Sequence, residues 1–399
     1  MIDILKVSFI FIFILFLLRK KISVGYALLA GSFLFLLLYP FDFENLTLSL
    51  LKTLTSQTSV NLFLSLTLIK SFEYSLRKTG TMEKMTETSQ SMLNNKKLSI
   101  VSMPLIIGML PSLGGAYLSA PMVDLATRNT NISKEEKAFI NYWYRHPWEL
   151  ILPLYPGIVL ASAISGVSLG NLIILNLPVA LLIFITGFLL SMQKIKSDER
   201  LNKTQNNIRN LLSFTPILLV LIPVIFFKIE LYIALFINLL IVCLYHKKSF
   251  KETFSIIKYG FTLDVIILVA GVMIFKEMLQ ISGAVDGIAK AITESKIPHL
   301  FIFITLPLFI GVITGISVGF VGSTFPLILH LKETVPHEIS IAFVSGYVGV
   351  LISPLHLCLI LTKEYFKADM LGVYRKIIPG CIIIFFIALI EFVILRYYS

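Results

Sequence analysis

Twelve long apolar runs dominate this sequence and constrain its fold more than any other feature. Most of them are close to the ~20 residues that a helix needs to cross the hydrocarbon core of a bilayer. Only 14% of the residues are charged, whereas soluble domains carry about a quarter, so a water-soluble globular protein is excluded. We predict an all-α polytopic membrane protein with apolar runs at 3–18, 23–40, 55–76, 98–127, 138–163, 170–191, 211–228, 230–246, 259–280, 299–330, 338–362 and 377–396.

The positive charge of the chain predicts how these runs are oriented. A net charge of +11 would suggest a nucleic-acid partner for a soluble protein, but in a membrane protein an excess of Lys and Arg marks cytoplasmic loops. We therefore expect no nucleic-acid partner and a multi-pass protein of the cell (plasma) membrane with both termini outside. The first run has no basic segment before it, so we predict an anchor rather than a cleaved signal peptide. Five clusters hold 21 of the 34 basic residues, at 19–21, 77–97, 194–209, 247–258 and 363–376.

The same charge assignment predicts two re-entrant hairpins. Three apolar runs lie between the basic clusters that end at Lys97 and begin at Lys194, and three full crossings would end on the wrong side. The run 98–127 is interrupted at 111–115, and each of its halves is about 20 Å of helix, which is too short for a crossing. The same count predicts a second hairpin at 299–330 that turns near Thr314, Gly315, Ile316 and Ser317. Irregular backbone at that depth must be buried in protein or line a cavity.

An internal repeat relates the two halves of the chain. With a shift of 203 residues, Met-Pro-Leu-Ile-Ile-Gly at 103–108 matches Leu-Pro-Leu-Phe-Ile-Gly at 306–311, and with a shift of 201 residues 153–154 match 354–355. The charge assignment starts the halves on opposite sides, so we predict inverted repeats, each with five crossings and one hairpin, and ten crossings in total. Inverted repeats with broken helices are typical of secondary transporters. The predicted units are a first repeat at 1–192, a cytoplasmic linker at 193–210 and a second repeat at 211–399.

Three segments carry a resemblance to a known family. Residues 108–122, 139–149 and 153–157 resemble an uncharacterised prokaryotic integral-membrane family, which is similar to the ion transporter superfamily of gluconate, citrate and dicarboxylate permeases. The resemblance covers essentially the whole chain. It implies a homodimer with a scaffold domain and a mobile transport domain that works by an elevator motion, with the amphipathic stretches 80–95 and 284–296 as connecting arms. The Ser-Asn-Thr hairpin tips of the sodium-coupled dicarboxylate carriers are absent here, so the resemblance specifies neither substrate nor coupling ion.

The first broken helix, predicted at 138–163, carries ionisable residues at membrane depth. Such residues are functional candidates by default, and the planar guanidinium of Arg145 suits a carboxylate or a phosphate. The alternative is a structural ion pair between Arg145 and Glu149, which lies four residues further along the same helix face. Both interpretations stay open at this point.

The second broken helix, predicted at 338–362, has small residues instead of charges. Residues 345–349 and Ser353 could present carbonyls and hydroxyls to a cation or substrate, or they could serve tight helix packing. Nearby, Gly315-Ile-Ser317-Val-Gly319 spells a nucleophile elbow, but that motif needs a preceding strand, and here it lies in a long apolar run. We therefore treat Ser317 as a hairpin-tip hydroxyl and expect no enzyme.

Further candidates are single polar residues inside apolar segments. Asp264 is the lone acid in the run 259–280 and is either a coupling-proton site or a solvated residue near the inner interface. The three cysteines show no metal-ligand spacing and are interpreted as small buried thiols. No metal site and no cofactor is expected beyond a coupling ion, H⁺ or Na⁺. The predicted ion-coupling residues are Glu149 and Asp264, and the predicted substrate-binding residues are Ser112, Gly114, Gly115, Arg145, His146, Thr314, Gly315, Ser317, Ser353 and His356.

Together these patterns predict a secondary active transporter of a small organic anion of the carboxylate type. Helix N-termini at the hairpin tips would supply partial positive charge, and Arg145 would add a full charge. A carrier or flippase for an anionic lipid headgroup is the first alternative. A membrane-embedded enzyme is the second.

Overall fold

A computed structural model describes residues 2–92, 95–111, 115–128, 130–193, 195, 212–284, 287, 298–329 and 335–398, and every regular element in these residues is a helix. Two of the predicted hairpin-tip residues, Ser112 and Gly114, lie outside the described residues. So do nearly all of the predicted linker 193–210 and most of the stretch 284–296.

The described residues of the first half form eleven helices, most of which lie within the predicted apolar runs. Two of them, α3 and α5, are amphipathic rather than apolar. The helices are α1 (Ile2–Arg19), α2 (Val24–Leu38), α3 (Phe43–Leu54), α4 (Gln57–Lys78), α5 (Thr81–Met92), α6 (Lys96–Gly108), α7 (Gly115–Ala126), α8 (Lys134–Trp143), α9 (Trp148–Ile151), α10 (Pro156–Ser165) and α11 (Leu169–Ser191).

The second half repeats this order of elements. Its helix α14 is the counterpart of α3, and its helices α17 and α18 are the counterparts of α6 and α7. The helices are α12 (Thr215–Phe226), α13 (Leu231–Tyr245), α14 (Phe250–Gly260), α15 (Leu263–Ile281), α17 (His299–Thr314), α18 (Ser317–Ile328), α19 (Pro336–Ile352), α20 (Leu357–Phe366) and α21 (Met370–Tyr398).

Both predicted hairpins are pairs of short packed helices. The first pair is α6 and α7, and the second is α17 and α18. At 1.5 Å per residue, the 13 residues of α6 span about 20 Å. The second hairpin turns at Gly315, whose left-handed φ of 65° ends α17, and α18 begins at Ser317. Glycine suits this position, because a residue without a Cβ atom adopts this backbone conformation at no steric cost.

The halves exchange reciprocal contacts. Helix α2 of the first half packs against α15 of the second, and α13, the counterpart of α2, packs against α4, the counterpart of α15. Helices α2 and α15 approach closely through two glycines: a Cβ atom on Gly25 would lie 2.5 Å from the carbonyl oxygen of Ile267, and one on Gly271 would overlap Gly25. Such small-residue contacts allow close helix packing in membranes.

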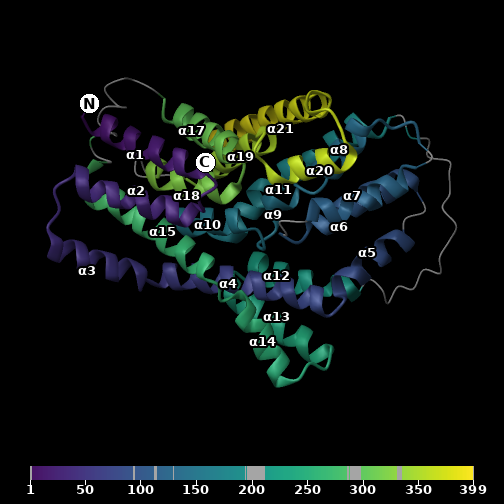
Figure 1. The fold of residues 1–399 in the computed structure, drawn as a ribbon, viewed down its shortest axis with the longest axis horizontal. Coiled ribbons are helices and arrows are strands. Elements are labelled where there is room, and N and C mark those ends of the chain that lie inside the picture. The colour runs from purple at the N-terminus through teal and green to yellow at the C-terminus, as the bar shows by residue number, and fades with distance from the viewer. Residues whose placement is uncertain are drawn as a thin grey trace.

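The helices form two groups, which Figure 1 shows as neighbouring bodies. The outer group comprises α1–α4 and α12–α15, with α13 and α14 projecting at the bottom of the view. The inner group comprises α6–α11 and α17–α21, and its most extensive helix contact joins α17 to α19. Helix α5 connects the groups in the first half, since it contacts both α4 and α6. The inner group contains all the helix breaks that the sequence predicts.

The surface is that of a membrane protein. In the described residues, four helical segments are long and apolar enough to span a membrane, or five if the bent pair α14–α15 is one span. Large apolar side chains are exposed along many helices, including Phe226 (76% exposed) and Leu244 (74% exposed). Soluble monomers rarely expose contiguous apolar surface of this kind. The chain is therefore an all-helical membrane protein.

Two helices were not predicted. Helices α3 and α14 lie in segments that the charge analysis treats as a connection and as a basic cluster. Both have polar side chains on one face, which breaks the run of apolar residues, so a search for long apolar runs does not detect them. Helix α14 is introduced by a capping box in which Ser249 and Glu252 bond each other's backbone N–H groups.

Candidate functional site

Two interrupted helices lie at the centre of the inner group. The first candidate span covers residues 134–165 and the second covers 336–366. The first is broken twice, between α8 and α9 and between α9 and α10, where Pro147, Pro153 and Pro156 remove N–H donors. The second is broken once, at 353–356, between α19 and α20. Both segments are interrupted helices in the structure.

The first break is hydrogen-bonded to the first hairpin. The indole Nε1 of Trp148 donates to the carbonyl oxygen of Leu105 at 2.6 Å, and the hydroxyl of Tyr155 donates to the carbonyl oxygen of Gly108. These carbonyls belong to the last turn of α6, which leaves them without helical partners. Backbone contact is close as well, because a Cβ atom on Gly108 would lie 2.5 Å from the carbonyl oxygen of Arg145.

The second break is bonded to the second hairpin in an equivalent way. The hydroxyl of Ser353 donates to the carbonyl oxygen of Val312 at 2.6 Å, and Nδ1 of His356 lies 2.7 Å from the carbonyl oxygen of Gly315. With the repeat shift of 201 residues, His356 is the counterpart of Tyr155. The side chains of each broken helix therefore complete the C-terminal turn of the hairpin helix in the same half.

The two breaks meet through a pair of histidines. Nε2 of His146 lies 2.9 Å from Nε2 of His356, and both side chains are buried. Nδ1 of His146 lies 2.6 Å from the carbonyl oxygen of Tyr142. The hydroxyl of Tyr347 donates to the carbonyl oxygen of His146 at 2.9 Å. The pair thus joins the first half of the chain to the second at full burial.

A thiol and a carboxylate stand next to this pair. The nitrogen and sulfur atoms that His146, His356 and Cys358 could offer to a metal ion all lie within 4.8 Å of one another. The Glu149 carboxylate has an oxygen 3.8 Å from Nε2 of His146. These four side chains, buried or nearly so, combine imidazole, thiolate and carboxylate donors, which is the donor set of divalent transition metals.

Arg145 is the one arginine buried in this region, and its guanidinium has free donors. The side chain is 4% exposed, and its Nε and Nη1 atoms have no hydrogen-bond partner. In the described part of the chain no ion pair joins it to Glu149, whose carboxylate lies 3.8 Å from Nε2 of His146 instead. Arg145 is nevertheless close enough to act electrostatically on Glu149 and on both histidines.

Three uncapped helix N-termini converge beside these side chains. Helices α10, α18 and α20 begin without a side-chain hydrogen bond at the cap residue. A Cβ atom on Gly157, in the first turn of α10, would meet Ser317 at the start of α18, and one on Gly315 would lie 2.9 Å from the backbone nitrogen of His356 at the start of α20. Unsatisfied N–H groups and the helix dipoles favour negative charge at such a point.

The structure brings most of the sequence-predicted site residues together, though not all. Arg145, His146, Glu149, Gly315, Ser317, Ser353 and His356 surround the two breaks. Gly115 begins α7, and Thr314 ends α17 with its hydroxyl bonded to the carbonyl oxygen of Ile316. Asp264 is exposed in the first turn of α15, in the outer group. The small residues of the second broken helix serve packing, since Gly346 and Gly349 receive Gly311 and Leu308 of α17 in direct contact.

Several residues of the site were not predicted. Cys358 is next to His146 in space but 212 positions away in sequence, so no spacing motif could reveal it. Tyr142 donates to the carbonyl oxygen of Leu351 at 2.9 Å, and Asn141 donates to the hydroxyl of Thr362 at 3.0 Å, so both link the halves. For Asn141, the only signal in the sequence was that it is a polar residue one helical turn before Arg145.

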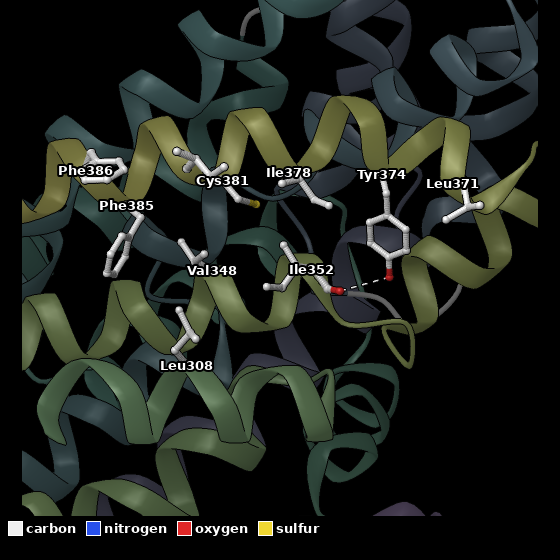
Figure 2. A pocket seen from close by; sticks show the side chains of 10 residues that line it. Leu308, Val348, Ile352, Leu371, Tyr374, Ile378, Cys381, Phe385 and Phe386 are labelled. Carbon is white, nitrogen blue, oxygen red and sulfur yellow. Dashed lines mark hydrogen bonds between the residues drawn. The ribbon is translucent and has the colours of Figure 1, made fainter. Parts of the chain in front are cut away.

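An apolar cavity that the described residues form lies away from this polar centre. It measures about 490 Å³ and is lined by side chains of α17, α19 and α21. Figure 2 shows Leu308 and Val348 on one wall and Phe385 and Phe386 on the other. Its wall is apolar except near one end, where the hydroxyl of Tyr374 donates to the carbonyl oxygen of Ile352 at 3.1 Å. That end adjoins the second break.

The fold and the site define a class: an all-helical membrane protein built from two similar halves, with broken helices that meet around buried ionisable groups. The chain belongs to the family described as "Protein of unknown function (DUF401)", whose model matches residues 2–395. Comparison with curated proteins finds no match.

A transporter has a similar fold. The structure resembles the crystal structure of the YdaH transporter of Alcanivorax borkumensis, which is described as revealing an unusual topology. The TM-score is 0.56 with 12% sequence identity, and the alignment covers 86% of this chain and 88% of the YdaH chain. At this identity the likeness establishes the fold.

Proposed function

We propose that the protein is a secondary active transporter of a small organic anion of the carboxylate type, coupled to H⁺ or Na⁺. The observation that carries this proposal is the guanidinium of Arg145, which is buried with two N–H-bearing nitrogens unpartnered. An unpaired buried charge costs several kcal/mol. A carboxylate would accept two parallel hydrogen bonds from this group and would also face the N-termini of α10, α18 and α20.

The fold supports a transporter rather than an enzyme or a channel. Its similarity to a transporter structure covers most of both chains. The elbow-like motif at Ser317 follows helix α17 and not a strand, so it lacks the context in which a serine nucleophile is presented. Two broken helices that meet near buried ionisable groups match the site architecture of secondary transporters.

We propose the finer topology on the same basis. Ten crossings would be made by α1, α2, α4, α8–α10, α11, α12, α13, α14–α15, α19–α20 and α21, with the two short hairpins re-entering the membrane. The repeated order of elements and the reciprocal packing of α2 on α15 and α13 on α4 support two repeats related by inversion. Single cysteines at 80–95 and at 284–296 should then react from opposite faces of the membrane, and reaction from the same face would contradict the inversion.

The two groups of helices suggest how access alternates. The outer group would form the scaffold and the contact of a homodimer, and the inner group would move as the transport domain in an elevator cycle. Helix α5 contacts both groups and would be a connecting arm. This proposal also includes a relationship to the gluconate, citrate and dicarboxylate permeases. It further places the protein in the plasma membrane with both termini outside the cell.

The decisive experiment is ligand binding by purified protein. We expect a carboxylate from a panel of small organic anions to raise the melting temperature, with an added effect of Na⁺ or of pH that identifies the coupling ion. Arg145→Gln should lose this shift while the unliganded protein stays folded. Arg375→Gln, which changes an exposed arginine on α21, is the matched control. A wild-type shift in Arg145→Gln would assign Arg145 a structural role.

The apolar cavity supports a second candidate function. A hydrocarbon chain in the cavity between α17, α19 and α21 would place its headgroup beside the second break, close to Ser353. A carrier of an anionic lipid would use the same fold in this way. Shifts produced by an anionic phospholipid and by no free carboxylate would favour this candidate over the first.

A further inference from the structure

We propose that His146, His356 and Cys358, with Glu149 as a fourth donor, form a binding site for a divalent transition-metal ion. The site joins the two halves of the protein at the point where their broken helices meet. It does not depend on the transport proposal, because it rests on the geometry of these side chains alone.

The hydrogen bonds of the two histidines define which ring nitrogens are free. A carbonyl oxygen can only accept, so the contacts of Nδ1 with the carbonyls of Tyr142 and Gly315 require a proton on Nδ1 of each ring. In a neutral imidazole the other nitrogen then carries a lone pair. Two nitrogens that both carry a lone pair would then lie 2.9 Å apart, which is repulsive unless both bind the same cation.

The same arrangement is typical of metal-binding histidines. A ligating histidine usually donates its second N–H to a backbone carbonyl or a carboxylate, which sets the tautomer and the ring orientation. Here both rings are oriented in that way by backbone groups, one at the end of α8 and the other at the turn of the second hairpin. The site is therefore preorganised from both halves.

The distances fit a late transition metal. At the usual metal–nitrogen distance of about 2.0–2.1 Å, nitrogens 2.9 Å apart subtend an angle of about 90° at the metal. This angle suits tetragonal or octahedral coordination, and a separation of about 3.3 Å would suit tetrahedral Zn²⁺. The thiol of Cys358 lies within 4.8 Å of both nitrogens and supplies a third donor.

A proton shared between the two histidines could occupy the same place as the metal ion. The thiol of Cys358 and the carboxylate of Glu149 favour the metal ion. A proton between the two nitrogens would leave the nearby thiol and carboxylate without a role. A divalent ion would use all four groups, and the thiolate and carboxylate charges would balance it. The positive charge of Arg145 would then remain uncompensated and available to an anion.

The test is the metal content and metal affinity of the purified, untagged protein. We expect about one Ni²⁺ or Co²⁺ per chain by elemental analysis, and a sulfur-to-metal charge-transfer band when Co²⁺ is added. Cys358→Ser should remove the band and weaken binding at least tenfold. His356→Gln should weaken binding more, because it removes one of the two imidazole ligands.

Matched controls separate this site from adventitious binding. Cys243→Ser and His246→Gln change residues near the end of α13, in the outer group, and should bind the metal as the wild type does. Chelator treatment should lower the melting temperature of the wild type and leave that of Cys358→Ser unchanged.

Two results would overturn the proposal. One is Co²⁺ binding by folded wild-type protein that is no tighter than binding by Cys358→Ser. The other is a coupling between the two Nε2 nuclei in ¹⁵N spectra of the metal-treated protein, which would identify a shared proton. Neither measurement uses a substrate, so both results can still be interpreted if the transport proposal fails.

Discussion

The two broken helices occupy equivalent places in the two halves, yet they are built differently. At the shift of 201 residues, Arg145 and Trp148 of the first half correspond to Gly346 and Gly349 of the second. The contact between hairpin and broken helix is conserved at this point: Gly108 abuts Arg145, and its counterpart Gly311 abuts Gly346. The side chains that fill the space around this contact differ completely.

The two broken helices therefore differ in what these positions do: in the second half they serve helix packing, and in the first half they carry ionisable and aromatic side chains. In the second half the two glycines of α19 let α17 lie directly against it, which is the most extensive helix contact in the molecule. In the first half large and polar side chains take their place, so α6 and α8 make a much smaller contact. The second break thus packs closely on its hairpin through glycines, and the first break carries the larger side chains of Arg145, which is ionisable, and Trp148 at the same positions.

The largest effect should come from breaking the close packing of the second half. Gly349→Leu would push a side chain into the backbone at Leu308, and overpacking of this kind costs about 3 kcal/mol. We expect a strongly lowered melting temperature or loss of folded protein in detergent. Trp148→Leu in the first half is the matched variant, and a larger loss there would reverse the comparison.

Arg145→Met should act in the opposite direction on stability. It removes an unpaired buried charge and replaces it with an apolar side chain of similar length, which stabilises by about 1–4 kcal/mol in comparable cases. The melting temperature of the unliganded protein should rise while ligand binding is lost. A clear destabilisation, with Arg375→Met unchanged, would mean that the guanidinium is needed for folding.

Tyr347→Phe tests the connection between the halves. The variant removes the hydrogen bond to the carbonyl oxygen of His146 and should cost about 1–2 kcal/mol, because that carbonyl is buried. Thermal unfolding measures this loss, and Tyr245→Phe, on an exposed tyrosine of α13, is the control. Equal stability of both variants would show that the break is held by other contacts.

Asp264→Asn should have the smallest effect. Asp264 is exposed in the outer group, and substitutions at such positions usually change stability by less than about 0.5 kcal/mol. We also expect its transport and ion dependence to match the wild type, in contrast to Glu149→Gln. Loss of ion coupling in Asp264→Asn, measured in proteoliposomes, would instead identify Asp264 as a coupling site.

Much of the architecture could be predicted because it depends on local patterns. Hydrophobic runs determine where helices lie in a bilayer, and prolines and glycines favour helix breaks. In the structure α17 ends at Gly315, and the two broken spans are interrupted near Pro153 and at Ser353. Helices α3 and α14 were not predicted, because their apolar residues occupy only one face and form no long apolar run. The site was predicted in part, since an arginine in an apolar run is conspicuous whatever surrounds it.

The sequence by itself determined the class of protein, the helix breaks, the correspondence of the two halves and the presence of ionisable groups at depth. Only the tertiary structure decided which of these groups meet. It placed His146 beside His356 and Cys358, left Nε and Nη1 of Arg145 without a hydrogen-bond partner, and put the Glu149 carboxylate 3.8 Å from His146 instead of in an ion pair with Arg145. The physical reason is that side-chain contacts between residues some 210 positions apart depend on how the two halves pack, and no periodicity along the chain encodes that packing.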